Sequence, residues 1–336
     1  MKLRVGIVGL GTNWESRYRP ALRALADRFD VRAVYAEVPM KARQVAEEFR
    51  AAPMHGIRAL AESPEVDAVM TLSPAWFGAF PILSACDCGK AVYSAPALAI
   101  DPNRAGEVKC RVEGAGIAFS AEFPRRHSPA TLRLKELIAT RLGPPTLLFC
   151  HHRLQHPPAG TNGTPQPIPD TAHLFRMELV ELVDWCQYVV GTKPTSVMGV
   201  THERADGIPD YRMMNLRFPG PGAEATVAQI SCGDYLAPAW PEARSFRPPA
   251  QLQVCCEHGT AFVDLPSTLV WFDEAGRHME SLESDRPVGE QLLTQFYRAV
   301  TSLVRKTDDL DDAYHALQVV LAAEQSAAQG QRLDLE

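Results

Sequence analysis

The N-terminal segment constrains the fold more than any other part of the chain. Leu3–Val8 is a short apolar run rich in β-branched residues, and Gly9-Leu10-Gly11 follows it directly before a helical pattern. Glycines between a strand and a helix let the backbone approach a pyrophosphate at the helix N-terminus. The segment therefore predicts a dinucleotide-binding unit in which Gly9, Gly11, Thr12 and Asn13 hold the phosphates. The alternative is that the two glycines serve only a tight turn.

Two residues beyond this loop bear on the cofactor. Trp14 stands where the G-x-G-x-x-G pattern has its third glycine, and an indole there opposes close packing of helix on strand. If Trp14 and Trp76 lay over the nicotinamide half of the site, they would narrow it. Glu37 comes 23 residues after Trp14, near the end of the second expected strand. A carboxylate there accepts from a ribose hydroxyl and repels a 2′-phosphate, which favours NAD over NADP.

Strands and helices alternate over the first third of the chain. The expected strands after the first are Val31–Ala36, Val66–Leu72, Ala91–Tyr93 and Ile117–Ser120. The expected helices start near Tyr18, with Leu22, Leu25 and Phe29 on one face, and continue with Met40–Phe49, Phe80–Cys88 and Asn103–Glu113. Repeated β-α-β units with short connections predict a parallel sheet covered by helices on both faces. We expect a doubly wound Rossmann domain over residues 1–122.

The pattern changes near Pro124. A helix is expected at Pro129–Thr140, and the proline- and glycine-rich segment Pro157–Pro169 is expected to be a loop. Further strands are expected at Thr146–Gln155, Ser196–His202, Tyr211–Phe218, Thr226–Cys232, Gln251–Glu257, Thr260–Val263 and Thr268–Phe272, and further helices at Leu174–Val190, Gly289–Arg305 and Leu310–Ala328. Hairpins among these strands predict an antiparallel sheet, and hence an α+β domain over residues 123–309.

Composition excludes several classes of protein. With 336 residues, 46% hydrophobic and 22% charged, the chain is long enough for two ordinary globular domains. A net charge of −6 without clustered Lys and Arg argues against nucleic acid as a partner. No long apolar run predicts a membrane span and no secretory signal is seen at the N-terminus, so a cytoplasmic location is expected. The eight cysteines have no C-x-x-C spacing and are expected to be reduced.

Four segments in a fixed order resemble the Gfo/Idh/MocA family, which is named for glucose–fructose oxidoreductase and inositol dehydrogenase. They are Ser63–Val69 (S-P-E-V-D-A-V), Gly89–Val92 (G-K-A-V), Phe123–Pro129 (F-P-R-R-H-S-P) and the C-terminal stretch Leu310–Gly330. The resemblance implies a nicotinamide cofactor, NAD or NADP, and a sugar- or polyol-like small molecule as substrate. It also implies a large, mostly antiparallel open sheet through which homodimers or homotetramers form, and a C-terminal segment, 310–336, that packs back on the first domain.

Departures from the family concentrate where its chemistry lies. The family's T-P-N-x-x-H turn reads Ser73–Gly78 and keeps only Pro74, while its glutamate-lysine-proline reads Ser94-Ala95-Pro96. Its active-site histidine corresponds to Glu181, three residues before the matching Asp184. The acidic residue that closes the family's second strand aligns with Ala36, one place before Glu37, which leaves the choice between NAD and NADP open. By this correspondence Ser73, Pro74 and Pro96 join the cofactor-binding residues.

Loss of the lysine removes the group that takes the substrate's hydroxyl proton, and such help is worth about 10²–10⁴ in rate. Glu181 and His173 are candidate replacements, because eight residues are about two helical turns and would put both on one face if the helix extends to His173. The alternatives are a salt-bridged Glu181 and a packing role for His173. Other titratable candidates are Tyr93, His127, His151, His152 and His156. Strand alternation places the rings of His151 and His152 on opposite faces, which argues against a metal site.

Three functions remain open from the sequence. The first is an NAD(P)-dependent oxidoreductase with an unusual proton route, and the second is a catalytically inactive sensor or partner protein that binds cofactor or ligand. The third is a non-oxidative enzyme that uses Glu181 or nearby histidines. Binding of a nicotinamide dinucleotide, with or without turnover, separates them.

Overall fold

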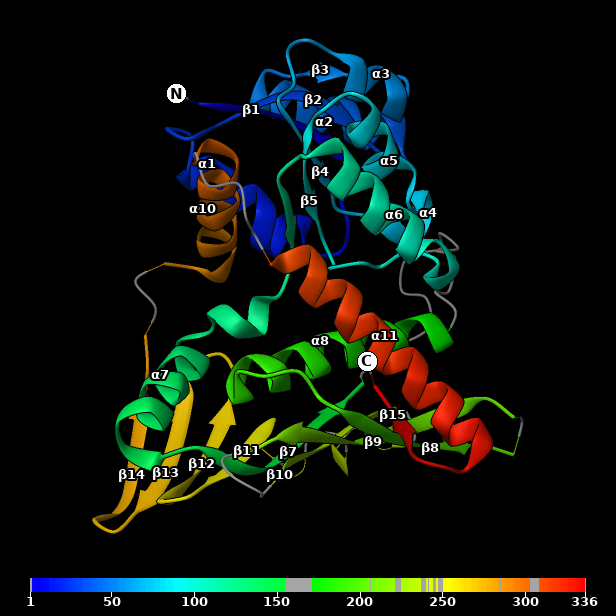
Figure 1. Ribbon diagram of the computed structural model, residues 1–336. Coiled ribbons are helices and arrows are strands. Elements are labelled where there is room, and N and C mark those ends of the chain that lie inside the picture. Colours follow the sequence, from blue (N-terminus) through cyan, green and yellow to red (C-terminus); the bar gives the residue numbers. More distant parts are fainter. Residues whose placement is uncertain are drawn as a thin grey trace. The chain divides into compact units, whose positions relative to one another are not determined.

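The structure is a computed structural model that describes residues 2–154, 171–205, 207–220, 225–236, 240, 242–243, 246, 250–283, 286–302 and 308–335. The chain forms two compact units, which Figure 1 colours along the sequence. The first unit consists of Met1–Pro124 and Asp285–His315, and the second of Arg125–Ser284 and Ala316–Glu336. The loop expected at Pro157–Pro169 and the candidate His156 lie outside the described residues.

The first unit contains a six-stranded sheet in the order β3-β2-β1-β4-β5-β6, with every pair parallel. Its strands are β1 (Leu3–Val8), β2 (Phe29–Tyr35), β3 (Ala52–Pro53), β4 (Ala68–Thr71), β5 (Ala91–Ser94) and β6 (Phe119–Ala121). The order reverses between β1 and β4, and open α/β sheets bind ligands beyond the carboxyl ends of the strands at such a point. The predicted Rossmann architecture is confirmed.

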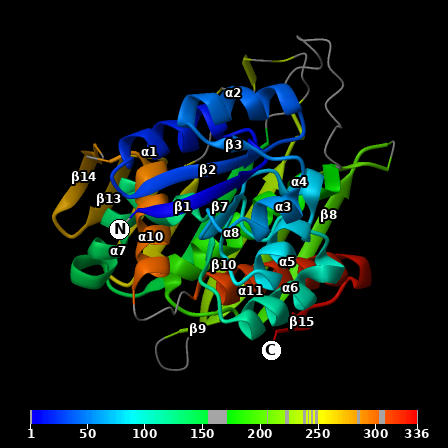
Figure 2. The same ribbon diagram turned by 90° about the horizontal axis from the view of Figure 1, so that it is seen from above.

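Helices cover both faces of this sheet (Figure 2). One face carries α1 (Arg19–Ala24), α2 (Pro39–Phe49) and α10 (Val288–Thr301), whose apolar side chains join those of β1, β2, β4 and β5 in one buried cluster. The other face carries α3 (Ile57–Glu62), α5 (Phe80–Asp87) and α6 (Pro102–Ala115). Because the strands are covered on both faces, they are apolar almost throughout, as β4 and β5 show.

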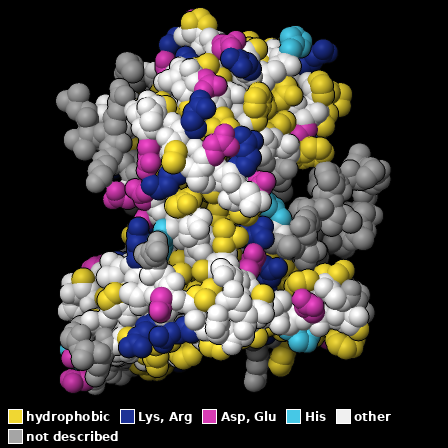
Figure 3. Space-filling view, turned by 45° about the vertical axis from the view of Figure 1, so that its right-hand side comes forward, with side chains coloured by type: hydrophobic (Ala, Val, Ile, Leu, Met, Phe, Trp, Pro, Cys, Tyr) yellow, Lys and Arg dark blue, Asp and Glu magenta, His cyan; other side chains and the backbone are white. Residues whose placement is uncertain are grey.

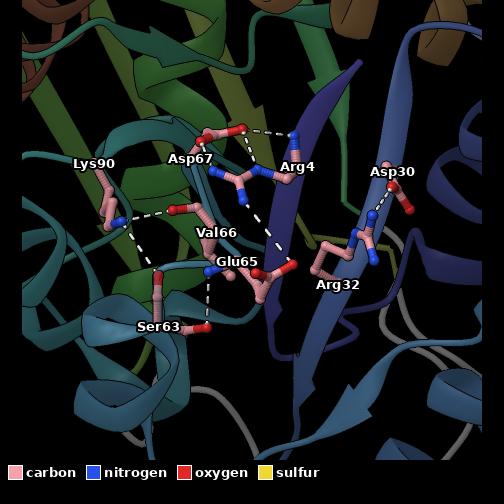
Figure 4. A network of polar contacts seen from close by, with 8 residues as sticks. All are labelled: Arg4, Asp30, Arg32, Ser63, Glu65, Val66, Asp67 and Lys90. Atoms are coloured by element: carbon pink, nitrogen blue, oxygen red, sulfur yellow. Dashed lines mark hydrogen bonds and ion pairs between the residues drawn. The ribbon is translucent and has the colours of Figure 1, made fainter. Parts of the chain in front are cut away.

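Two of the segments that carry the family resemblance meet at the amino-terminal edge of this sheet (Figure 4). The carboxylate of Asp67 accepts from the backbone N, Nε and Nη2 of Arg4 at 2.7–3.1 Å, and these bonds lower the pKa of Asp67. Lys90 Nζ donates to the carbonyls of Ser63 and Val66 at 3.2 and 2.6 Å. The two motifs therefore tie the entries of β1, β4 and β5 together, at the edge opposite the carboxyl ends of the strands.

The second unit contains a nine-stranded sheet in the order β14-β13-β12-β11-β7-β10-β9-β8-β15. Its strands are β7 (Pro145–Arg153), β8 (Ser196–Glu203), β9 (Pro209–Pro219), β10 (Ala225–Gly233), β11 (Leu252–Cys256), β12 (Gly259–Asp264), β13 (Thr268–Asp273), β14 (Gly276–Ser281) and β15 (Leu333–Asp334). All neighbouring strands are antiparallel except β7 and β10, which run parallel. The expected large, mostly antiparallel sheet is confirmed.

Among the described residues, helices pack on only one face of this sheet, and the other face is called the open face (Figure 1). The packed face carries α7 (Pro129–Leu137), α8 (Thr171–Val190) and the part of α11 (Asp309–Gln329) that belongs to this unit. At Gly199 the backbone of α11 approaches β8 so closely that an added Cβ would lie 2.0 Å from the Ala323 carbonyl oxygen. The open face carries exposed apolar side chains, and Figure 3 shows some hydrophobic groups along the bottom of the view.

Several expected elements differ from the observed ones. Phe29, which the sequence predicts on the first helix, begins β2, because the helix ends at Ala24 and a short turn leads into the strand. The expected helix Pro129–Thr140 is α-helical only to Leu137 and continues as the π-helix η3 (Ile138–Leu142). The structure adds the short elements β3, α3, α4 (Pro74–Phe77), β14, β15 and the 3-10 helix η2 (Pro124–His127), for which the sequence showed no periodicity.

Candidate functional site

The carboxyl edge of the first sheet gathers every residue that we expected to contact a cofactor. The loop Gly9–Asn13 follows β1, Glu37 follows β2, Ser73 and Pro74 follow β4, and Pro96 follows β5. The neighbouring strands are aligned so that Val8 pairs with both Tyr35 and Thr71. The segments beyond these pairs therefore lie along one edge of one unit.

The two loop glycines have conformations that other residues rarely adopt. Gly9 and Gly11 have φ angles of +73° and +60°, in the left-handed region. A Cβ at Gly9 would lie 2.4 Å from Ser73 Cβ, and one at Gly11 would lie 2.2 Å from the Leu72 carbonyl oxygen. The Gly11 N–H donates to Ser73 Oγ at 2.8 Å. Both glycines are thus required for the loop to approach the end of β4.

A helical turn starts directly after this loop and offers donors for a phosphate. The π-helix η1 (Trp14–Tyr18) leads into α1, and the side chain of Asn13 caps none of its amides. Gly11 and Thr12 are exposed and Asn13 is half-exposed. Uncapped N–H groups at a helix start, next to glycines that keep the approach clear, fit a pyrophosphate. The loop therefore fits the nucleotide that the resemblance implies.

Trp14 is part of the hydrophobic core of the first unit. It is 3% exposed and packs edge-on against Phe49, with ring centroids 6.0 Å apart. Its indole is therefore packed into the core and is not exposed at the surface of the loop. Trp76 is 58% exposed and Phe80 is 49% exposed, so neither side chain belongs to the core.

Two positions after β2, Ala36 and Glu37, could correspond to the family's acidic residue that closes this strand. Ala36 is 5% exposed and belongs to the core, whereas Glu37 is half-exposed. Of the two, only Glu37 carries a side chain that can bond to a ribose hydroxyl. Its place beyond β2 fits that role.

The position of the family's lysine faces the core in this chain. Ala95 is 2% exposed and belongs to the same apolar cluster as Tyr93 and Phe296, and its peptide bond to Pro96 is cis. The neighbouring Ser94 Oγ donates to the Ala97 carbonyl at 2.9 Å. Neither Ala95 nor Ser94 therefore offers a proton-transfer group to a ligand.

A buried polar cluster beside Ala95 was not anticipated from the sequence. Glu122 is 2% exposed, directly follows β6, and forms an ion pair with Arg17 of η1. The hydroxyls of Tyr18 and Tyr93 lie 3.4 Å apart beside it, and burial raises the pKa of both. Arg17 and Glu122 are 105 positions apart, so no local sequence pattern could reveal their ion pair. With such raised pKa values, the two tyrosines remain neutral at physiological pH.

In the second unit, Glu181 lies on α8 and is engaged by an arginine. Arg125 of η2 forms ion pairs with Glu181 and with Glu178, one helical turn earlier. The Arg125 side chain is 13% exposed, and its carboxylate partners keep its pKa above the usual value in spite of burial. The adjacent Arg126 pairs with Asp184, whose side chain is 2% exposed. The salt-bridged role that was the alternative for Glu181 is the one that these contacts support.

The candidate histidines fall in different surroundings. His173 lies within α8, so helical geometry extends to it, and eight residues separate it from Glu181 by about 12 Å along the axis. His127 is half-buried, and this burial together with Arg126 lowers its pKa to about 4. The ring nitrogens of His151 lie 2.8 Å from Ser231 Oγ and 2.9 Å from the Tyr235 hydroxyl. His152 Nδ1 lies 2.5 Å from Glu178 Oε1, on the α8 side of the sheet.

Two absences hold for the part of the chain that the structure describes. It contains no group of three or more His, Cys, Asp or Glu side chains arranged to hold a metal ion. It also contains no helix with the length and hydropathy of a membrane span.

A parallel sheet of this strand order, with a glycine loop and uncapped amides at its carboxyl edge, defines the class of NAD-binding Rossmann proteins. Residues 3–123 match the model of the Gfo/Idh/MocA group, described as an oxidoreductase family with an NAD-binding Rossmann fold. The first unit is therefore similar to the NAD-binding domain of this family, in agreement with the resemblance that the sequence motifs carry.

Similar proteins agree with this assignment. An inositol 2-dehydrogenase of Cereibacter sphaeroides is 31% identical over 176 residues, and the match spans about half (51%) of each chain. An oxidoreductase of Thermotoga maritima has a TM-score of 0.81 at 20% identity and covers 99% of this chain and 98% of its own. An aldose–aldose oxidoreductase of Caulobacter crescentus has a TM-score of 0.81 at 16% identity over the full length of both. At such identities the solved structures show that the fold is shared across both units.

Proposed function

We propose that the chain is an NAD(P)-dependent oxidoreductase that acts on a sugar- or polyol-like small molecule through a non-standard proton route. The observation that carries the proposal is the glycine loop at the sheet edge, where Gly11 is held against β4 and η1 starts uncapped. A protein that used these glycines only for a turn would not need open amides beside them. The family and the inositol and aldose specificity of similar proteins support the substrate class.

When bound, a nicotinamide cofactor accepts or donates a hydride, and the residues of this chain hold it and move the accompanying proton. The amides after Asn13 would bond to its pyrophosphate, and the Glu37 carboxylate to the ribose of its adenosine half. Ser73, Pro74 and Pro96 would form the floor of the site along the same edge. Because a carboxylate repels a 2′-phosphate, we propose NAD as the preferred form.

Fluorescence titration of the purified protein with NADH and, separately, NADPH tests cofactor binding. We expect NADH to bind more tightly than NADPH. Glu37→Ser should reduce the difference between the two dissociation constants. A second step measures reduction of NAD with a panel of sugars and polyols that includes myo-inositol. If neither dinucleotide binds, the oxidoreductase function is excluded, and release of product without cofactor would then indicate a non-oxidative enzyme.

A second candidate is a catalytically inactive sensor or partner protein that binds the cofactor or a sugar-like ligand. Two observations favour it: Ala95 faces the core at the lysine position, and Glu181 at the histidine position is neutralised by Arg125. Binding of NADH together with an absence of turnover across the whole panel is the result that this function predicts.

We also propose that the protein forms a homodimer or homotetramer through the open face of the second sheet. Exposed apolar side chains on the neighbouring strands β7 and β10 support this, with Leu147, Phe149 and Val227 each more than a third exposed. Contiguous apolar surface of this kind marks interaction sites. Phe149→Glu should shift the mass measured by light scattering toward the monomer, whereas a monomeric wild type would contradict the proposal.

A further inference from the structure

One buried carboxylate of the first unit is bonded to the helical segment that follows the glycine loop. Glu122 comes directly after β6, and its side chain is 2% exposed. Arg17 of η1 forms an ion pair with it. In the order of the sheet, β4 and β5 separate β6 from β1. The Arg17 side chain therefore connects the segment after β1 with the far end of the carboxyl edge.

A second side chain of η1 reaches the same carboxylate. The Tyr18 hydroxyl interacts with Glu122 and lies 3.4 Å from the hydroxyl of Tyr93 on β5. Burial, Tyr93 and Glu122 raise the pKa of Tyr18, so this hydroxyl stays protonated. A π-helix has a wider turn than an α-helix, so its consecutive side chains diverge less and both reach one partner. Contacts from two adjacent residues fix the rotation of η1 about its axis as well as its distance from β6.

The backbone of η1 is also closely packed. At Gly289 of α10, an added Cβ would lie 2.7 Å from the Arg17 carbonyl oxygen. The amides of Arg17 and Tyr18 both donate to the Asn13 carbonyl, at 2.9 and 3.2 Å. Since η1 continues directly into α1, the whole helical segment is Trp14–Ala24. A shift or rotation of this segment therefore moves Asn13 and the loop before it.

The glycine loop has two other attachments, and both precede η1. The Gly9 amide donates to the Tyr35 carbonyl of β2, and the Gly11 amide donates to Ser73 Oγ after β4, each at 2.8 Å. These bonds fix the loop as far as Gly11. The stretch after Gly11 carries the uncapped amides and is held through η1, and hence through Glu122.

We propose that Glu122 is a positioning residue for the dinucleotide, and that it acts through Arg17 and Tyr18 to hold the end of the glycine loop where it binds a pyrophosphate. The inference rests on the cofactor binding of the proposed function. It assigns Glu122 a part in affinity for the cofactor and no part in proton transfer.

An ion pair suits this task because it resists displacement. Burial opposes the charge of Arg17, but Glu122 outweighs it and raises the pKa of the guanidinium. Removal of one partner from a buried pair leaves an uncompensated charge, which is strongly unfavourable away from water. Without Glu122, the guanidinium would therefore turn toward water, and η1 would no longer be fixed against β6.

Two measurements on the full chain test the inference. In hydrogen exchange followed by mass spectrometry, Glu122→Gln should speed exchange in peptides that contain the Arg17 and Tyr18 amides. In fluorescence titration, the same variant should raise the dissociation constant for NADH about tenfold. Asp67→Asn is the matched control, because it breaks a carboxylate–guanidinium pair with Arg4 in the same unit, at the amino-terminal edge. It should leave both the exchange of these amides and the dissociation constant at wild-type values.

Two further variants keep the test decisive if Glu122→Gln does not fold. Arg17→Met combined with Glu122→Gln removes both charges, which costs far less stability than removal of one. Because it lacks the ion pair, the double variant should also bind NADH about tenfold more weakly than the wild type. Glu122→Asp retains a carboxylate and should bind NADH more tightly than the double variant.

The outcomes separate this inference from the function on which it rests. Wild-type affinity for NADH in Glu122→Gln or in the double variant overturns the role of Glu122 and leaves the oxidoreductase function intact. Unchanged amide exchange in Glu122→Gln, or an equal loss of affinity in Asp67→Asn, has the same consequence. If the wild-type protein binds neither NADH nor NADPH, the proposed function and the role of Glu122 are both overturned.

Discussion

Arg125 is the first residue of the second unit, and its guanidinium pairs with the carboxylate of Glu181 on α8. Glu181 stands where the family's motif has its histidine, so a residue that resembles a catalytic acid is held in an ion pair. The same arginine also pairs with Glu178, whose Oε1 lies 2.5 Å from His152 Nδ1.

Glu181→Gln should therefore affect stability more than chemistry. The change leaves Arg125 with Glu178 as its remaining carboxylate, so we expect a loss of about 1–3 kcal/mol in the free energy of unfolding by urea. Glu107→Gln, on an exposed face of α6, serves as the control and should leave stability unchanged. A large fall in kcat with unaltered stability would instead make Glu181 the catalytic residue.

Gly11→Ala should weaken both the first unit and its cofactor binding. The new methyl meets the Leu72 carbonyl oxygen, in addition to the cost of a positive φ. Gly78→Ala is the matched control, since Gly78 has a φ of +55° but an added Cβ there would meet no other atom. This variant should lose only the cost of the left-handed backbone conformation, about 1–2 kcal/mol. We expect the larger loss for Gly11→Ala in urea unfolding, together with weaker NADH binding in fluorescence titration. Equal losses would show that the loop relaxes.

His127 should make stability depend on pH. Its pKa falls from 6.5 to about 4 on folding, because burial and Arg126 disfavour the charged ring. Between these values the unfolded chain binds the proton and the folded chain does not, so stability is complete above pH 6.5 and falls by about 1.4 kcal/mol per unit down to pH 4. Urea unfolding across this range should show a shallower slope for His127→Gln. As a control, His55→Gln at an exposed position should keep the wild-type dependence of unfolding free energy on pH. An unchanged dependence in His127→Gln would contradict the prediction, because it would mean that the His127 ring is solvated in the folded chain.

Lys90→Met should destabilise the first sheet at its amino-terminal edge. It removes the donor to the Ser63 and Val66 carbonyls, and each unmet buried group costs about 1–3 kcal/mol (Figure 4). The exposed Lys41 provides the control, and Lys41→Met should unfold at the wild-type temperature. If Lys90→Met unfolds at the same temperature as this control, water replaces the ammonium group, and the hydrogen bonds of Lys90 contribute little to stability.

Much of the fold could be predicted because its signals are local. The run Leu3–Val8 with its glycines, and the strand and helix periods that follow, predicted the parallel sheet and the residues at its carboxyl edge. Boundaries were less certain, since the end of α1 before Phe29 depends on how the chain packs rather than on which residues are apolar. Two-residue strands such as β3 and β15 are too short to show any period.

The interactions that define the candidate site were harder to foresee. Arg125 and Glu181 are 56 residues apart, and Arg17 and Glu122 are 105 apart. Such pairs form only when the tertiary fold brings distant segments together, and no spacing rule encodes them. The resemblance to the family indicated where the usual groups were missing. Only the packing of η2 on α8 showed which charges had replaced them.

The burial of Trp14 directly after the glycine loop has a practical consequence. Tryptophan emits light at wavelengths that a reduced nicotinamide absorbs, so a dinucleotide seated on that loop would quench this indole by energy transfer. The protein thus contains its own optical sensor of occupancy, which needs neither an added dye nor turnover. Quenching that disappears in Trp14→Phe would locate the nucleotide to this end of the sheet.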